Sequence, residues 1–85
     1  MEISTAARAF DALGHPTRLA VFRLLVPAGD EGIPAGQISG QLALPPSTLS
    51  SHLAVLQEAG LIAVQRQGRT LRYSVNRAGL ADLTG

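Results

Sequence analysis

An alternation of apolar and polar residues between Ile62 and Val75, broken once at Gln67-Gly68, is the feature that most constrains this fold. Successive side chains of a strand point to opposite faces, so each arm predicts a β-strand with one apolar face. Gln67-Gly68 supplies turn residues, and Gly68 is expected to adopt a positive φ at the tip. The sequence therefore predicts a β-hairpin over about residues 62–76.

A short helix, a tight turn and a second helix are predicted directly before this hairpin. The first helix begins near Ala35 and is interrupted at Pro45-Pro46, because proline disfavours helix in the residue before it. The inward residues of the second helix share one face, at spacings i, i+4 and i+7: Leu49, Leu53 and Leu56. Helix, turn and helix over about residues 34–60 is the helix-turn-helix arrangement.

Ser47 and Gly60 mark the ends of that second helix. The Ser47 hydroxyl is expected to accept a hydrogen bond from the backbone near Ser50 and so to cap the helix. Gly60 is expected to stop it in a left-handed conformation. Because a basic hairpin follows at once, the fold class predicted is mainly α with a β-hairpin, a winged helix-turn-helix whose wing is formed by residues 62–76.

Two helices are predicted nearer the N-terminus. Ser4 or Thr5 can cap the first and Gly14 ends it. Its apolar residues fall on one stripe: Ile3, Ala6, Ala7, Phe10 and Leu13. The second helix begins at Pro16 and runs to Val26, apolar almost all round, which predicts a place at the centre of the core.

The remaining segments are a loop and a last helix. Residues Pro27 to Pro34 are rich in glycine, proline and acidic residues and are predicted to form a surface loop. The last helix is expected to begin around Ala78, with Leu80 and Leu83 on one side. Such a short helix is unstable in isolation and must pack on something.

Length and composition predict one domain over residues 1–85, since independent cores need about 50–200 residues. A hydrophobic fraction of 46% against 15% charged residues excludes a disordered chain. A chain this short is marginal alone, so an oligomer is expected. With no Cys, disulfides, a Cys-based zinc finger and a thiolate nucleophile are excluded. No stretch resembles a membrane span or a signal peptide, so a cytoplasmic protein without a membrane partner is expected.

The charges are unevenly placed along the chain. All seven cations are arginines; residues 1–62 hold three of them against five acidic residues, a balance of 3 − 5 = −2. Residues 63–85 hold four arginines against Asp82 alone, a balance of 4 − 1 = +3. A basic tip on an acidic body is typical of a surface that binds a polyanion. The alternative is that these arginines are simply solvated.

The sequence offers no parts for catalysis. It has no nucleophile beside a base, no paired carboxylates on one face, no glycine-rich phosphate loop and no metal-ligand cluster, so an enzyme, a cofactor and a metal site are not expected. His15 is interpreted as a helix-junction residue rather than a metal ligand. It lies far from His52 in sequence, without a supporting cluster of ligands.

Several separated segments resemble the ArsR family of bacterial winged-helix repressors. In chain order they are residues 12–19 (ALGHPTRL), 47–53 (STLSSHL), 58–62 (EAGLI) and 67–69 (QGR) before Tyr73. The resemblance covers about residues 6–83. It implies a homodimer built from the first and last helices, bound to an inverted repeat of double-stranded DNA in a promoter and released by an inducer.

The resemblance also implies which residues read DNA. The matching positions lie in the N-terminal half of the second helix of the helix-turn-helix: Pro46, Ser47, Thr48, Ser50 and Ser51. Short hydroxyls suit a helix N-terminus in the major groove, where they meet phosphates and base edges. Many relatives carry Gln in place of Pro46, and proline cannot make the two-point contact with adenine that Gln can. The alternative is that Ser47 is only a cap and that Ser50 and Ser51 are only solvated.

Three wing arginines are expected along the minor groove: Arg69 at the tip, then Arg66 and Arg72. His52 matches the histidine of the family's Ser-x-His-Leu motif. We interpret it as a hydrogen-bonded structural residue at the edge of the buried stripe rather than a phosphate contact.

The inducer is the least determined part of the sequence. Relatives that sense trivalent arsenic use cysteines just after the start of the last helix, and this chain has none. Either the chain stops before the sensor, or it answers another signal, or it answers none; the short final helix favours the first. A winged helix that contacts only proteins is the alternative function, although it would not need a basic wing.

Overall fold

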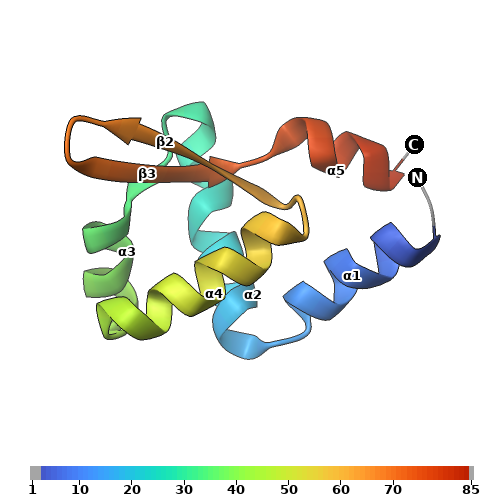
Figure 1. Ribbon diagram of the computed structural model, residues 1–85, viewed down its shortest axis with the longest axis horizontal. Coiled ribbons are helices and arrows are strands. Elements are labelled where there is room, and N and C mark those ends of the chain that lie inside the picture. Colours follow the sequence, from blue (N-terminus) through green and yellow to red (C-terminus); the bar gives the residue numbers. More distant parts are fainter. Residues whose placement is uncertain (1–2, 85) are drawn as a thin grey trace.

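Helices pack against a small sheet in the computed structural model of the chain, which describes residues 3–84 and side chains up to residue 80 (Figure 1). In chain order the elements are α1 (Ile3–Leu13), α2 (Pro16–Leu25), the 3₁₀ segment η1 (Val26–Glu31), β1 (Ile33–Pro34), α3 (Ala35–Leu42), α4 (Pro46–Glu58), β2 (Ile62–Gln67), β3 (Thr70–Val75) and α5 (Arg77–Thr84). This order confirms the predicted winged helix-turn-helix, mainly α with a β-hairpin.

The hairpin is part of a three-stranded antiparallel sheet with strand order β1-β3-β2. The prediction of a plain loop from Pro27 to Pro34 was wrong, because this segment forms η1 and then β1, where Ile33 pairs with Tyr73. A two-residue strand is too short to show an alternation in sequence. Gly32 allows the pairing: its φ is +68°, and a Cβ there would lie 2.2 Å from the Tyr73 carbonyl oxygen.

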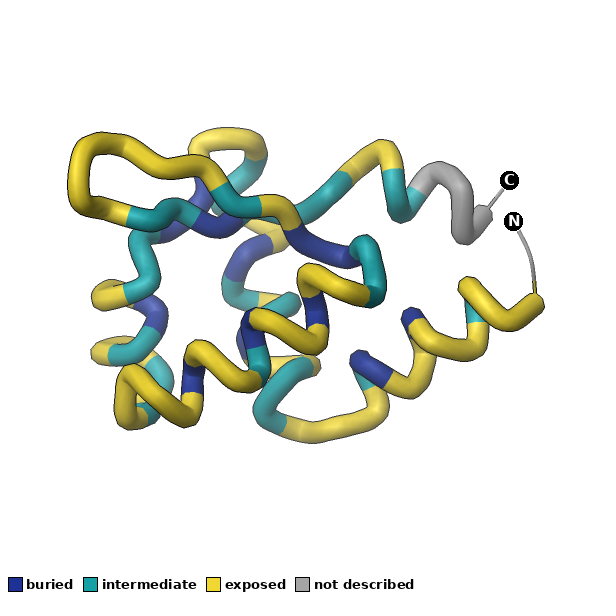
Figure 2. The backbone as a smooth tube through the Cα atoms, in the orientation of Figure 1, coloured by how far each residue is buried: buried dark blue, intermediate teal, exposed yellow. Residues whose placement is uncertain are grey.

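One apolar core lies between the helices and the sheet (Figure 2). Its residues are Ala9, Ala12, Val21, Leu25, Ile33, Ile38, Leu49, Leu53, Leu56, Leu61, Ile62 and Tyr73. All three predicted inward leucines of α4 are among them. The second helix is less enclosed than predicted, because Leu19 is 41% exposed and Val26, just past its end, is 52% exposed.

Helix α1 turns the larger residues of its predicted apolar stripe, Ile3 and Phe10, away from the core, whereas Leu13 at the end of that stripe packs against it. Ile3 is 88% exposed and Phe10 is 71% exposed, whereas Ala9 and Ala12 are buried. Alanine lets the α1 backbone approach its neighbours closely, so the face with the smaller side chains packs within the chain and Ile3 and Phe10 are left outside. Ser4 and Thr5, predicted as caps, lie within the helix.

The turn between α3 and α4 is closed by local hydrogen bonds. Ala43 adopts a left-handed conformation with φ 53°. The Leu44 N–H donates to the Ser39 carbonyl at 3.0 Å, and the Ser39 hydroxyl donates to the Leu44 carbonyl. These bonds satisfy carbonyl and amide groups that the end of α3 leaves without helical partners.

Ser47 does not cap α4, contrary to the prediction. The helix begins one residue earlier, with Pro45 as N-cap and Pro46 at the first helical position, and no side chain donates or accepts a cap hydrogen bond there. Proline suits that position because its φ is already helical and it has no N–H to satisfy. Ser47 therefore lies inside the first turn.

The predicted glycine conformations are confirmed: φ is +77° at Gly60 and +60° at Gly68. Helix α5 begins at Arg77, one residue before the predicted start, and Leu80 packs against the core. The Leu83 side chain lies outside the described residues. Within the described part of the chain, no helix has the length and apolar character needed to cross a membrane.

Candidate nucleic-acid interface

Two exposed elements lie at the same end of the molecule, away from α1 and α5: the N-terminal half of α4 and the turn between β2 and β3 (Figure 1). The α4 residues predicted to meet DNA are all exposed: Pro46, Ser47, Thr48, Ser50 and Ser51. Their exposure follows from the buried leucines of the same helix, which direct the opposite face to solvent. The structure thus brings the predicted serine and threonine cluster and the wing tip to one end.

The first turn of α4 presents backbone donors as well as hydroxyls. Its first helical hydrogen bond runs from the Leu49 N–H to the Pro45 carbonyl at 3.0 Å, so the N–H groups of Ser47 and Thr48 precede it. Such groups, with the partial positive charge of a helix N-terminus, suit a phosphate oxygen. The Ser51 hydroxyl donates to the Ser47 carbonyl at 3.3 Å, which leaves its oxygen free to accept a bond.

The wing arginines do not share one environment. Arg69 is exposed at the turn next to Gly68. Arg66 is also exposed and pairs across the strands with Leu71, so it lies on the sheet face that carries the apolar residues. Arg66 is thus available to a ligand that approaches the wing from the α4 side, and Arg69 is accessible at the tip.

Arg72 lies on the opposite sheet face and is held by the backbone. It pairs with Gln65 across the strands, while Nε donates to the Glu31 carbonyl at 2.9 Å and Nη2 donates to the Gly32 carbonyl at 3.0 Å. Sequence reasoning grouped Arg72 with Arg66 and Arg69, and the structure separates it from them. Its guanidinium fastens the wing to the segment that joins η1 to β1.

His15 and His52, distant in sequence, meet in the fold. Their ring centroids are 4.8 Å apart, and His15 Nδ1 accepts the Thr17 N–H at 3.2 Å as the N-cap of α2. Burial lowers the pKa of His52, and the nearby His15 and Arg18 lower it further. His52 is half-buried beside the junction of α1 and α2. The sequence predicted a hydrogen-bonded histidine, and the structure shows a ring contact with His15. No local pattern in the sequence signals this pair.

Arg18 completes that corner. Its Nε donates to the Ala12 carbonyl at 2.6 Å and so joins α2 to the end of α1. Among the residues that the structure describes, no three potential metal ligands gather in one place. The ring contact of His15 with His52 joins α4 to this corner, and the Arg18 bond holds the two helices that form it.

Comparison with known proteins finds a helix-turn-helix family and relatives that are transcriptional regulators. A family model described as a helix-turn-helix domain matches residues 13–65. An uncharacterised helix-turn-helix-type transcriptional regulator of Mycobacterium tuberculosis is 35% identical over 78 residues, which cover 91% of this chain and 66%, just under two thirds, of that protein. The transcriptional repressor SdpR of Bacillus subtilis is 34% identical over 73 residues, covering 86% of this chain and 78% of the repressor. Among solved structures, an ArsR-like transcriptional regulator from Rhodococcus sp. RHA1 has a TM-score of 0.80 at 27% identity, covering 95% of this chain and 74% of that one.

Proposed function

Because this chain belongs to the ArsR family of winged helix-turn-helix transcriptional regulators, a family of regulators rather than enzymes, we propose that it represses transcription by binding double-stranded DNA. In this proposal α4 enters the major groove and the wing follows the adjacent minor groove. The observation that carries it is the placement of a hydroxyl-bearing helix N-terminus and two exposed wing arginines at one end of the molecule.

The proposed contacts divide into two kinds. At α4, the backbone N–H groups of Ser47 and Thr48 and the hydroxyls of Ser47, Thr48, Ser50 and Ser51 meet phosphates and base edges, and the Pro46 ring contacts the DNA beside them. Arg66 and Arg69 neutralise phosphates or enter the minor groove. Arg72 is proposed to act indirectly, since its guanidinium holds the carbonyls of Glu31 and Gly32.

The proposal includes a homodimer formed through the first and last helices. Ile3 and Phe10 support it, because they leave a bulky apolar stripe of α1 exposed at the end of the molecule opposite to the wing tip. α5 lies at that same end (Figure 1). A two-fold dimer would present two copies of α4 to the two halves of an inverted repeat.

Release by an inducer is also part of the proposal. Trivalent arsenic is the inducer that the family resemblance suggests, although the sequence has no Cys to bind it. A gel shift with DNA from upstream of the protein's own gene, with and without arsenite, tests this point. Loss of the shifted band on adding arsenite would support arsenic induction, and an unchanged band would exclude it for this chain.

Arg69→Ala provides the test of DNA binding itself. We expect weaker binding to every duplex and a salt dependence of log K reduced by about one unit for each bound subunit, because one phosphate contact is lost. Filter binding over a salt series measures both quantities. Arg23→Ala is the matched control, since Arg23 is exposed on α2 outside the proposed interface.

Equal salt slopes for Arg69→Ala and the unchanged chain would contradict a role of the wing in phosphate contact. Failure of the chain to bind any duplex would overturn the DNA-binding proposal and favour a winged helix that contacts proteins.

A further inference from the structure

The groove-facing surface of α4 lacks long polar side chains. Over its first three turns the exposed residues carry only rings, hydroxyls and methyl groups: Pro46, Ser47, Thr48, Ser50, Ser51, Ala54 and Val55. The first longer exposed polar side chains, Gln57 and Glu58, come in the last turn, and Glu58 lines a hollow with Arg8 and Asp11 of α1. Nothing in the first three turns can reach a base with a forked end.

This composition limits how a base pair can be recognised. Two-point contacts require Arg or Lys on guanine, or Asn or Gln on adenine. A single hydroxyl bonds to either kind of base and discriminates weakly. The Ser51 hydroxyl has even fewer ways to contact a base. Its proton is donated to the Ser47 carbonyl, so its oxygen can only accept a hydrogen bond from a base. The remaining feature that is unique in the major groove is the C5-methyl group of thymine, which is read by apolar contact.

Thr48 is the residue best placed for that contact. It is exposed in the first turn of α4, the part of a recognition helix that reaches base edges, and it bears a methyl group beside its hydroxyl. Its β-branched side chain is restricted in χ1, so the methyl group is held in few orientations.

We propose that α4 selects DNA by the methyl groups of thymine, with Thr48 as the specificity-determining residue. The inference rests on the proposed DNA-binding function and deepens it. Burying one methyl-sized group contributes about 0.8 kcal/mol, which corresponds to about a fourfold change in affinity for each thymine read. Guanine edges contribute little in this scheme.

A double-mutant cycle between protein and DNA tests the inference. The full chain first selects a duplex from a random-sequence library. Each thymine of one half-site is then replaced by deoxyuridine, which lacks the methyl group but keeps the pairing edge. A second series replaces each guanine by 7-deazaguanine, which lacks the N7 acceptor. Affinities are measured for the unchanged chain, for Thr48→Ser, which loses the methyl and keeps the hydroxyl, and for Thr17→Ser on α2 as the matched control, outside the proposed DNA and dimer surfaces.

We expect one deoxyuridine to weaken binding by the unchanged chain and by Thr17→Ser about fourfold and to have no effect on Thr48→Ser. 7-Deazaguanine is expected to change affinity less than twofold for all three proteins. The cycle cancels any change that deoxyuridine makes in the shape of the duplex, because all three proteins meet the same DNA.

Three outcomes would overturn the inference while leaving DNA binding intact. They are no effect of deoxyuridine on the unchanged chain, an equal effect on the unchanged chain and Thr48→Ser, and a larger effect of 7-deazaguanine than of deoxyuridine. Binding to all duplexes with equal affinity would also overturn it. Failure to bind any duplex would overturn the proposed function as well.

Discussion

At the scale of the residue, the positive φ values and the positions of the wing arginines show which features can be predicted from the sequence. The positive φ values at Gly60 and Gly68 were predictable because glycine has no Cβ to strain. Ala43, at φ 53°, was not, because alanine gives no local signal for that conformation. Arg72 could have been separated from Arg66 by counting strand parity alone, but its two carbonyl partners lie about forty residues earlier and only the fold brings them near.

His52 makes one residue-scale prediction about pH. Its pKa is lowered in the folded protein by burial and by the neighbouring His15 and Arg18. The unfolded chain therefore binds a proton at His52 more readily, and the fold is destabilised as pH falls below about 6.5 until the folded-state pKa is passed. Urea unfolding midpoints between pH 7.5 and 5.5 should fall for the unchanged chain and fall less for His52→Gln. Parallel curves for the two proteins would show that His52 carries none of this dependence.

At the scale of the element, most helices were predictable and one strand was not. Glycine and proline mark the ends of α2, α3 and α4, and the leucine spacing fixes the buried face of α4. β1 was not predicted, because its two residues form a strand by pairing with β3 and show no strand pattern of their own. The start of α1 was misjudged because a serine or threonine near a helix end is compatible with a position inside the helix.

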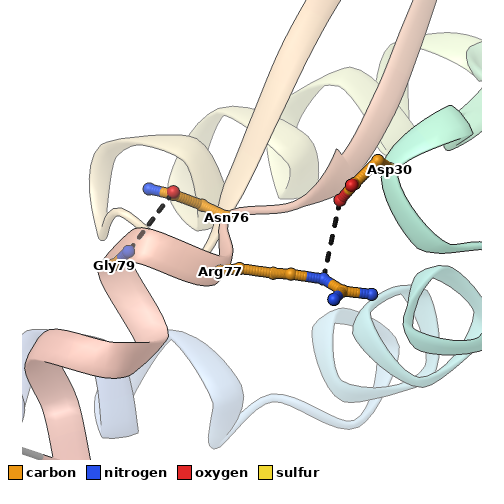
Figure 3. Close-up of polar contacts among 4 residues, drawn as sticks. All are labelled: Asp30, Asn76, Arg77 and Gly79. Carbon is orange, nitrogen blue, oxygen red and sulfur yellow. Dashed lines mark hydrogen bonds and ion pairs between the residues drawn. The ribbon is translucent and has the colours of Figure 1, made fainter.

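The start of α5 depends on a network around Asn76 (Figure 3). Asn76 Oδ1 accepts the Gly79 N–H at 3.3 Å, and Nδ2 donates to the Gly60 carbonyl at 3.0 Å. Arg77 Nε lies 3.5 Å from Asp30 Oδ1, but both side chains are exposed, so this pair contributes at most about 1 kcal/mol. The helix is thus attached mainly through Asn76 to the turn after α4.

Gly79→Ala tests that attachment. A Cβ at Gly79 would lie 2.2 Å from the Gly60 carbonyl oxygen, so the substitution should lower the free energy of unfolding by about 1–3 kcal/mol. Gly40→Ala is the matched control in α3, where a Cβ meets no atom within 4 Å and should stabilise the protein by about 0.5–1 kcal/mol. Chemical denaturation of both variants measures the two effects. Shifts of the same sign would contradict this description of α5.

At the scale of the whole molecule, the sequence predicted a partner surface without showing which side of α1 would form it. Both the alanine face and the bulky stripe follow a helical period, so either could have packed within the chain. The structure assigns Ala9 and Ala12 to the core and leaves Ile3 and Phe10 outside. The same limit applies to the wing. Its positive charge could be predicted from the sequence, but its orientation could not.

Phe10→Glu tests the proposed dimer. A carboxylate on the exposed stripe of α1 should prevent its burial against a second copy and yield a folded monomer, because an unpaired charge is costly to bury. Light scattering after size exclusion gives the mass, and far-ultraviolet circular dichroism checks the fold. Val26→Glu is the control, since Val26 is an exposed apolar residue on η1. An unchanged mass for Phe10→Glu, or a monomeric parent chain, would refute this interface.

The two carbonyl bonds of Arg72 have a thermodynamic consequence for the proposed complex. A hairpin free to swing would lose conformational entropy at every encounter with a duplex, whereas one clamped from behind has lost it already during folding. In the proposed complex, rigidity is thereby supplied by a side chain on the far face of the sheet, so the affinity for DNA would depend on a group that holds the wing from behind.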